Sequence, residues 1–221
     1  MNLVYFTLFA LLLFMSVLLG GKKFRSSALY ALAIGGCVNA NFFNAKTYPI
    51  DIFGLTFGID SILYTLFIFC VIVLLLDQGK KQAYILSFSS IIATMLCAIF
   101  QLVSSLLSKG YSNNVWIPFF DFAISSISSV IVVIIIIELL SFFKKRNIVN
   151  NQYLLLLIGG LIATLIKSPT YYFFANLLNE SPLYTLEAIS TSLIGKLISI
   201  GVSLLTLFTL NLYDNKTKKI Q

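Results

Sequence analysis

Residues 115–142 read VWIPFFDFAISSISSVIVVIIIIELLSF, and a basic cluster follows at 144–146. Asp121 and Glu138 are the only charged residues within this stretch. A helix needs roughly 17–25 mostly apolar residues to cross the hydrocarbon core of a bilayer. The stretch is longer than that, so it predicts a membrane-spanning helix that tilts or overhangs the core.

The rest of the chain has a similar composition. Of its 221 residues, 59% are hydrophobic and 10% are charged, and the mean hydropathy is +0.97. Soluble domains carry about 25% charged residues. Because so few charges cannot cover a water-facing surface, we expect the lipid bilayer to surround most of the exterior. The net charge of +7 would suggest a nucleic-acid partner in a soluble protein, but here we assign it to cytoplasmic loops and expect no such partner.

Seven hydrophobic spans follow one another, separated by short breaks rich in charged residues, Gly, Pro or Asn. They lie at 3–20, 26–45, 57–76, 83–107, 115–142, 153–178 and 186–213. No break is long enough to hold a second domain, so we expect a single all-α transmembrane bundle of about seven helices over residues 1–221. The first span carries its basic residues after the apolar run rather than before it, which favours a retained anchor over a signal peptide.

Basic residues are concentrated in alternate loops. Eleven of the fifteen lie in the first, third and fifth loops or in the tail. They are Lys22, Lys23, Arg25, Lys80, Lys81, Lys144, Lys145, Arg146, Lys216, Lys218 and Lys219. The opposite loops hold Lys46 and Lys109. Because basic loops stay in the cytoplasm, we expect an external N-terminus, a cytoplasmic C-terminus and a multi-pass protein of the cell membrane, as in a bacterial plasma membrane.

Several chemistries are excluded by the residues that the sequence lacks. It contains no histidine, so it has no imidazole base and no His-ligated metal. It has no G-x-x-x-x-G-K-[ST] phosphate loop. Cys37, Cys70 and Cys97 lie in apolar spans without paired spacing, and we interpret them as packing residues. We therefore expect neither a cofactor nor a metal, and no enzymatic activity.

The most informative residues are ionisable groups inside the spans, because such groups usually face a cavity or a partner. Lys167 and Lys196 lie near the middle of the sixth and seventh spans. At 1.5 Å per residue, both are roughly 15–17 Å below the outer ends of their helices, so they share a depth. Asp121 and Gln101 lie nearer the outer surface. Glu138, near the inner end of its span, is expected to reach toward Lys144.

Helical spacing places further polar residues on the same faces as these charges. Three stripes result: Asp121, Ser125, Ser128 and Ser129; Gly160, Thr164, Lys167 and Tyr171; and Ser192, Lys196, Ser199 and Ser203. Such stripes can be ordinary packing seams, but the two lysines favour a cavity that opens outward. The candidate substrate-binding residues are Asn41, Gln101, Asp121, Lys167, Tyr171 and Lys196. An ion pair of a lysine with Asp121 or Glu138 is the simpler alternative.

Five short motifs resemble the vitamin-uptake or queuosine-precursor transporter family, in its Gram-positive form with an extra N-terminal helix. They are Ala40-Asn41, Lys46-Thr47, Phe53-Gly54-Leu55, Ser61-Ile62-Leu63-Tyr64 and Gly79-Lys80-Lys81-Gln82-Ala83. The resemblance implies import of a 7-deazaguanine base by a membrane bundle without its own ATPase domain. It also implies a fold related to the substrate-binding components of energy-coupling-factor transporters.

The sequence also departs from that family. Acidic positions of the family correspond to Ile72, Leu76, Lys167 and Ser203 here, and a tyrosine position corresponds to Gln78. The residues carried over are Asn41, Lys46 and Lys196. Because buried acids are lost and a lysine is gained, a neutral or anionic ring-containing solute fits better than a cationic amine.

Three alternatives stay open to a transporter that imports its solute without a partner protein. The chain can be the substrate-binding component of an energy-coupling-factor transporter, with a separate energising partner that docks on a seam such as Ala31-x-x-x-Gly35. It can be a membrane sensor or assembly protein. It can also be an intramembrane enzyme with a lysine-activated serine, for which Ser192 lies on the Lys196 face whereas Ser168 points away from Lys167.

The basic-loop pattern generates a topology prediction. A reporter that is active only in the cytoplasm should be active when fused after Gln221, because the Lys-rich tail is expected inside. A reporter that requires export should be inactive at the same position. The opposite result would overturn the seven-span topology.

Overall fold

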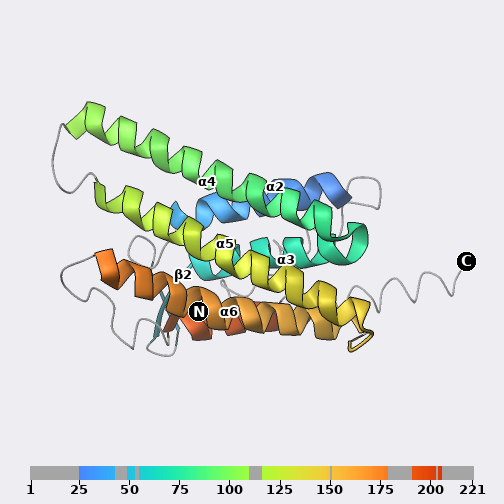
Figure 1. Ribbon diagram of the computed structural model, residues 1–221. Helices are drawn as coiled ribbons and strands as arrows, with labels where there is room; N and C mark the ends of the chain where they lie inside the picture. The colour runs from blue at the N-terminus through green and yellow to red at the C-terminus, as the bar shows by residue number, and fades with distance from the viewer. Residues whose placement is uncertain are drawn as a thin grey trace, which may run out of the picture.

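The computed structural model describes residues 25–42, 49–52, 55–109, 116–149, 151–178, 191–202 and 204–205. Its elements in chain order are α2 (Arg25–Phe42), β1 (Pro49–Ile52), β2 (Leu55–Gly58), α3 (Asp60–Gln78), α4 (Lys80–Lys109), α5 (Trp116–Lys145) and α6 (Gln152–Leu178). A further helix follows at Thr191–Val202. From α2 to α6, consecutive helices run in opposite directions and form an up-and-down bundle (Figure 1).

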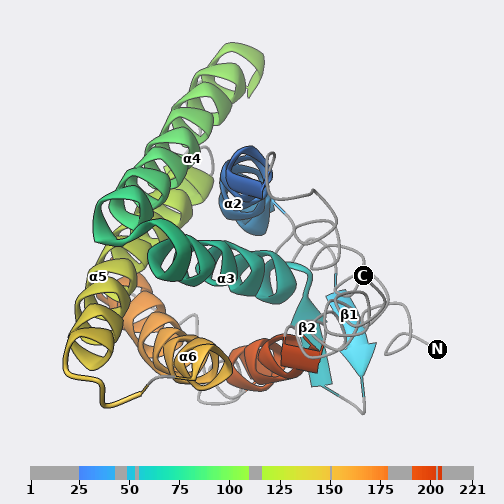
Figure 2. The ribbon, with the colours of Figure 1, turned by 90° about the vertical axis from the view of Figure 1, so that its right-hand side faces the viewer.

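Helix α3 lies at the centre of this bundle. Every residue from Ser61 to Leu75 is buried, and a helix that is apolar on all sides must be covered on all sides. Figure 2 shows α3 with α2, α4, α5 and α6 around it. Helix α2 approaches it most closely at Gly36, where an added Cβ would lie 3.0 Å from the carbonyl oxygen of Leu63.

Helix α4 is polar on its inner face and apolar on its outer face. Ser87, Ser90 and Thr94 are buried and donate hydrogen bonds of 2.7, 2.9 and 3.0 Å to carbonyls one turn back. The outer face consists of large side chains that are 42% exposed or more. They are Ile85, Phe88, Ile92, Leu96, Ile99, Phe100, Val103 and Leu107. Water disfavours so large an apolar face, whereas hydrocarbon accepts it.

Four helices are long and apolar enough to cross a membrane, namely α3, α4, α5 and α6. The expected spans at 26–45 and 186–213 correspond to shorter apolar helices, Ser27–Ala40 and Thr191–Val202. These helices are compatible with the expected membrane bundle. The first expected span, 3–20, lies outside the described residues, so the count of seven stays a prediction.

A short hairpin corrects the expected start of the third span. That span was predicted to begin at 57, but Leu55–Gly58 forms strand β2, which pairs antiparallel with β1 so that Pro49 faces Gly58 and Ile52 faces Leu55. Helix α3 begins only at Asp60. Periodicity alone missed the hairpin because each strand has only four residues, and so short a run has an ambiguous periodicity.

The connections at one end of the bundle are tight. Gly79 has a positive φ of 89° and donates its N–H to the Leu75 carbonyl at 3.1 Å, which ends α3 and lets α4 start at the next residue. After α5, Asn147 adopts a left-handed conformation with φ 53°. Asn151 Oδ1 then accepts hydrogen bonds from the backbone N–H groups of Tyr153 and Leu154 at 2.9 and 3.4 Å and caps α6.

These connections carry the basic residues, and we call this end of the bundle the basic end, defined by Lys80, Lys81, Lys144, Lys145 and Arg146. The start of α2 at Arg25 lies at the same end (Figure 1). The prediction that alternate loops share one side is confirmed for the described part of the chain. The expectation that Glu138 reaches toward Lys144 is wrong. Lys80 pairs with Glu138 instead, and Lys144 donates to the Leu76 carbonyl at 3.0 Å.

Gly159 marks the closest packing of α6, and this generates a stability prediction. A Cβ at Gly159 would lie 2.5 Å from Ile72 Cδ1 and 2.9 Å from Leu140 Cδ1, whereas one at Gly201 would meet nothing within 4 Å. Overpacking costs about 1–3 kcal/mol. Gly159→Val should therefore be less stable than Gly201→Val by about that amount in detergent unfolding. Equal stabilities would contradict this packing.

Candidate functional site

The two mid-span lysines meet over one aromatic ring inside the bundle. Lys167 comes from α6 and Lys196 from the helix Thr191–Val202, and they are 6% and 5% exposed. Their Nζ atoms lie 5.1 and 5.9 Å from the centroid of the Tyr64 ring on α3. This geometry lets the negative face of the ring stabilise both cations. The prediction that the two lysines share a depth is confirmed.

Lys167 is held by the serine stripe of α5. Its Nζ donates to the Ser125 carbonyl at 2.5 Å, to Ser125 Oγ at 3.2 Å and to Ser129 Oγ at 2.8 Å. Ser129 in turn donates to the Ser125 carbonyl at 2.7 Å. The helical spacing predicted that Ser125 and Ser129 share a face, and the structure confirms that this face meets the Lys167 face of α6.

Lys196 is held by one serine from each of two helices. Its Nζ donates to Ser168 Oγ on α6 and to Ser192 Oγ on its own helix, each at 2.6 Å. The two hydroxyl oxygens lie 3.2 Å apart. Ser168 points away from Lys167 as expected, but that direction brings it to Lys196. We name the whole set the central lysine site: Lys167, Lys196, Tyr64, Ser125, Ser129, Ser168 and Ser192.

One carboxylate lies on the Tyr64 face of α3. Asp60, in the first turn of α3, is four residues before Tyr64, so the two side chains lie on one face of the helix. Its Oδ1 atom and the Tyr64 hydroxyl are buried, and neither has a hydrogen-bond partner among the described residues, although Ser129 lies near that hydroxyl. Buried polar atoms are normally satisfied by protein, water or a bound molecule. The site therefore has capacity for a polar ligand.

Tyr171 extends the site along α6. Its ring centroid lies 6.0 Å from Lys167 Nζ, and its hydroxyl donates a long hydrogen bond of 3.5 Å to Asp121 Oδ1. Asp121 was expected to approach a lysine directly. The described contact runs through Tyr171, so Asp121, Tyr171 and Lys167 form a chain from α5 to α6.

Two other candidates are not brought to the lysines by any described contact. Gln101 lies on α4, where its Oε1 atom is buried without a hydrogen-bond partner among the described residues. Asn41 lies in the last turn of α2, and its side chain is outside the described residues. Lys46 and Ser203 are outside them as well.

Sequence reasoning missed Tyr64 and Ser168 as parts of the central lysine site. Tyr64 was quoted only for its resemblance to a family motif, although it is a polar side chain in an otherwise apolar helix. Ser168 precedes Pro169, which lies inside α6. Because proline has no N–H, the helix loses one hydrogen bond there.

The hydrogen bonds from Lys167 to Ser125 and Ser129 lead to a double-mutant prediction. Ser129→Ala removes one acceptor from a buried ammonium and should cost about 1–3 kcal/mol of stability in detergent unfolding. In a Lys167→Met background the same change should cost much less, because no ammonium then needs the hydroxyl.

The matched control is Ser126→Ala. Ser126 directly follows Ser125 on α5. Its hydroxyl is buried and makes no hydrogen bond with the described residues, so its loss should change stability by less than about 0.5 kcal/mol. Equal costs at 126 and 129 would show that Ser129 does not hold Lys167.

Comparison of the chain with known proteins finds no family model, no curated protein and no solved structure that matches it. Any statement about its function therefore depends on the geometry of the central lysine site and on the residues of the chain itself.

Proposed function

We propose that this chain is a transporter of the cell membrane that imports a small ring-containing solute, with the central lysine site as its binding site. The observation that carries the proposal is the pair of buried ammonium groups of Lys167 and Lys196, which lie 5.1 and 5.9 Å from the centroid of the Tyr64 ring and have serines among their hydrogen-bond partners. A membrane interior disfavours unpaired charges strongly. Two cations held there by neutral hydroxyls are a receptor for a molecule that enters and leaves.

The chemistry of the site favours an anionic or neutral solute with a flat ring. The described hydrogen-bond partners of the two ammonium groups are neutral hydroxyl and carbonyl oxygens, so the site favours a solute that brings a negative charge. The Tyr64 and Tyr171 rings supply apolar faces against which a flat ring can stack. Resemblance to the vitamin-uptake and queuosine-precursor transporters supports a 7-deazaguanine-like or vitamin-like molecule, and the positive site favours one that carries a carboxylate or another anionic group.

The expected topology gives the direction of entry. With the N-terminus outside, Asp121 and Tyr171 lie in the outer half of the bundle, and their contacts with each other and with Lys167 mark the route by which the solute would reach the lysines. Helix ends and loops that carry basic residues then face the cytoplasm.

Three other functions compete with this proposal. As the substrate-binding component of an energy-coupling-factor transporter, the chain would bind the same solute but need a separate energising partner. As a sensor or assembly protein, it would not move a solute. As a hydrolase, it would use Lys196 to activate Ser168 or Ser192. The 2.6 Å distances from Lys196 Nζ to the two hydroxyl oxygens support this mechanism.

Removing the charge of Lys196 tests the binding site. Lys196→Met keeps the length of the side chain, and loss of a charge-assisted hydrogen bond should weaken binding by about tenfold to a hundredfold. Binding is measured by equilibrium dialysis of purified protein with radiolabelled 7-deazaguanine bases and anionic ring-containing vitamins such as biotin. Lys81→Met, an exposed lysine at the basic end, is the control and should bind normally.

The same purified proteins, wild type and variants, distinguish the competing functions. Uptake by wild-type protein alone in liposomes supports the self-sufficient transporter, whereas binding without uptake supports the component of a larger transporter. Ser168→Ala should lower affinity moderately if Ser168 only positions Lys196, but should abolish turnover of a hydrolase substrate. Normal binding by Lys196→Met would refute the central lysine site as the solute site.

A further inference from the structure

A second polar feature lies at the basic end, remote from the central lysine site. A pocket of about 250 Å³ opens there between the α3–α4 turn and the last turns of α5. Lys80, Lys144, Lys145 and Ser141 line its polar part, and Leu76 and Leu140 are among the apolar residues that line the rest. Lysines at the rim of an apolar pocket are suited to a ligand with an anionic head and an apolar tail.

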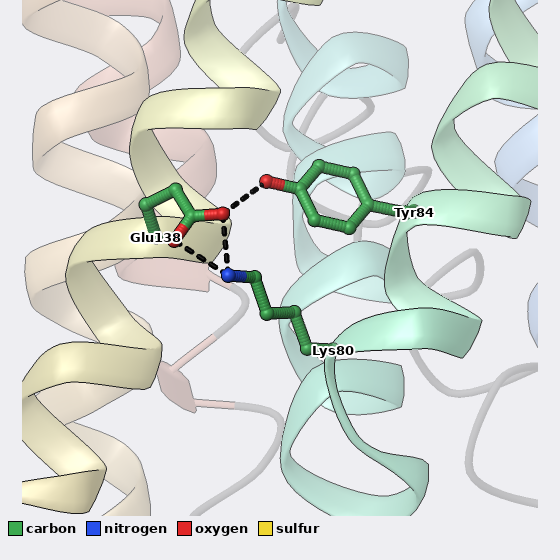
Figure 3. Close-up of polar contacts among 3 residues, drawn as sticks. All are labelled: Lys80, Tyr84 and Glu138. Carbon is green, nitrogen blue, oxygen red and sulfur yellow. Dashed lines mark hydrogen bonds and ion pairs between the residues drawn. The ribbon is translucent and has the colours of Figure 1, made fainter.

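One of the two described carboxylates at this end is already paired with a lysine. Glu138 accepts hydrogen bonds of 2.6 Å from Lys80 Nζ and from the Tyr84 hydroxyl (Figure 3). Asp77, exposed near the end of α3, is the other carboxylate at this end among the described residues. The five lysine and arginine side chains of the basic end thus outnumber the two carboxylates, and the pocket is left with a positive potential.

The pocket also offers neutral hydrogen-bond donors. Ser141 Oγ is buried and has no hydrogen-bond partner among the described residues. Gly79, which also lines the pocket, immediately precedes α4, whose first-turn N–H groups have no acceptor within their own helix. Such a helix start attracts anions. The Leu76 carbonyl, which would repel an anion, is covered by Lys144 at 3.0 Å.

The position of the pocket indicates where its ligand comes from. It lies where the apolar helices α3, α4 and α5 end or begin, which is the level of lipid headgroups in a membrane. Phe142 is 50% exposed beside it, and the Arg146 guanidinium lies 5.9 Å from the Phe142 ring. Basic side chains of this kind gather at the cytoplasmic interface of membrane proteins.

We propose that this pocket binds the phosphate headgroup of an anionic phospholipid. Lys144, Lys145 and Ser141 contact the phosphate, the start of α4 adds backbone N–H groups, and Leu76 and Leu140 contact the first methylenes of the acyl chains. Basic pockets between membrane helices on the cytoplasmic side are suited to such headgroups. The bound lipid would join the α3–α4 turn to the end of α5.

The test uses the purified full chain in a neutral detergent, titrated with dioctanoyl phosphatidylglycerol while the unfolding temperature is followed. The wild type should be stabilised in a saturable way, and dioctanoyl phosphatidylcholine should have much less effect. The double variant Lys145→Gln with Ser141→Ala removes one charge and the unpartnered hydroxyl, and should bind phosphatidylglycerol about tenfold more weakly. Lys144→Gln is a second variant in case the first one is poorly folded.

Arg146→Gln is the matched control, because it removes one charge from the same end but does not line the pocket. It should bind phosphatidylglycerol within about twofold of the wild type. An equal loss in Arg146→Gln, or equal stabilisation by phosphatidylcholine, would overturn the proposal. Saturable stabilisation by inorganic phosphate alone, with an affinity equal to that for phosphatidylglycerol, would identify a free phosphate ligand and would also overturn it.

Discussion

Two ammonium groups buried in an apolar bundle constrain how its helices pack. In hydrocarbon no water is present to satisfy them, so Lys167 and Lys196 need hydroxyl and carbonyl oxygens from neighbouring helices. Ser125 and Ser129 supply these from α5, and Ser168 supplies one from α6. The relative rotation of three helices is therefore fixed by two side chains, while Tyr64 holds α3 against the same point.

The two polar regions of the bundle follow different physical rules. At the basic end, water and lipid headgroups can hydrate the charges, so Lys80 and Glu138 form an exposed pair that is 46% and 51% exposed and contributes little to stability. At the central lysine site each ammonium instead needs several fixed acceptors. This difference explains why the charges of the loops serve to predict topology, whereas the charges inside the spans indicate a candidate binding site.

Much of this architecture could be predicted from the sequence, because length, hydropathy and helical periodicity are local properties. They located α4, α5 and α6 within a few residues and placed Ser125 and Ser129 on the face that meets Lys167. The hairpin before α3 was missed because each strand has only four residues, and so short a run has an ambiguous periodicity. Helical spacing placed Ser192 on the Lys196 face, but it missed Ser168 as a partner of Lys196 and Lys80 as the partner of Glu138, because contacts between helices depend on how the helices rotate against each other.

The proposed solute site and the proposed lipid site share one physical requirement. In each, the positive charge of lysine side chains in or near the membrane is balanced by a bound anion and not by carboxylates of the protein. At the centre, the described hydrogen-bond partners of the two ammonium groups are neutral oxygens, so a bound anionic solute would lower the electrostatic free energy of the site. Pro169 lies two residues from Lys167 and one from Ser168, where α6 lacks a hydrogen bond. A change in the bend of α6 would therefore move Ser168, which accepts from Lys196, together with the ammonium group of Lys167. Such a movement would couple binding of the proposed solute to the shape of the bundle.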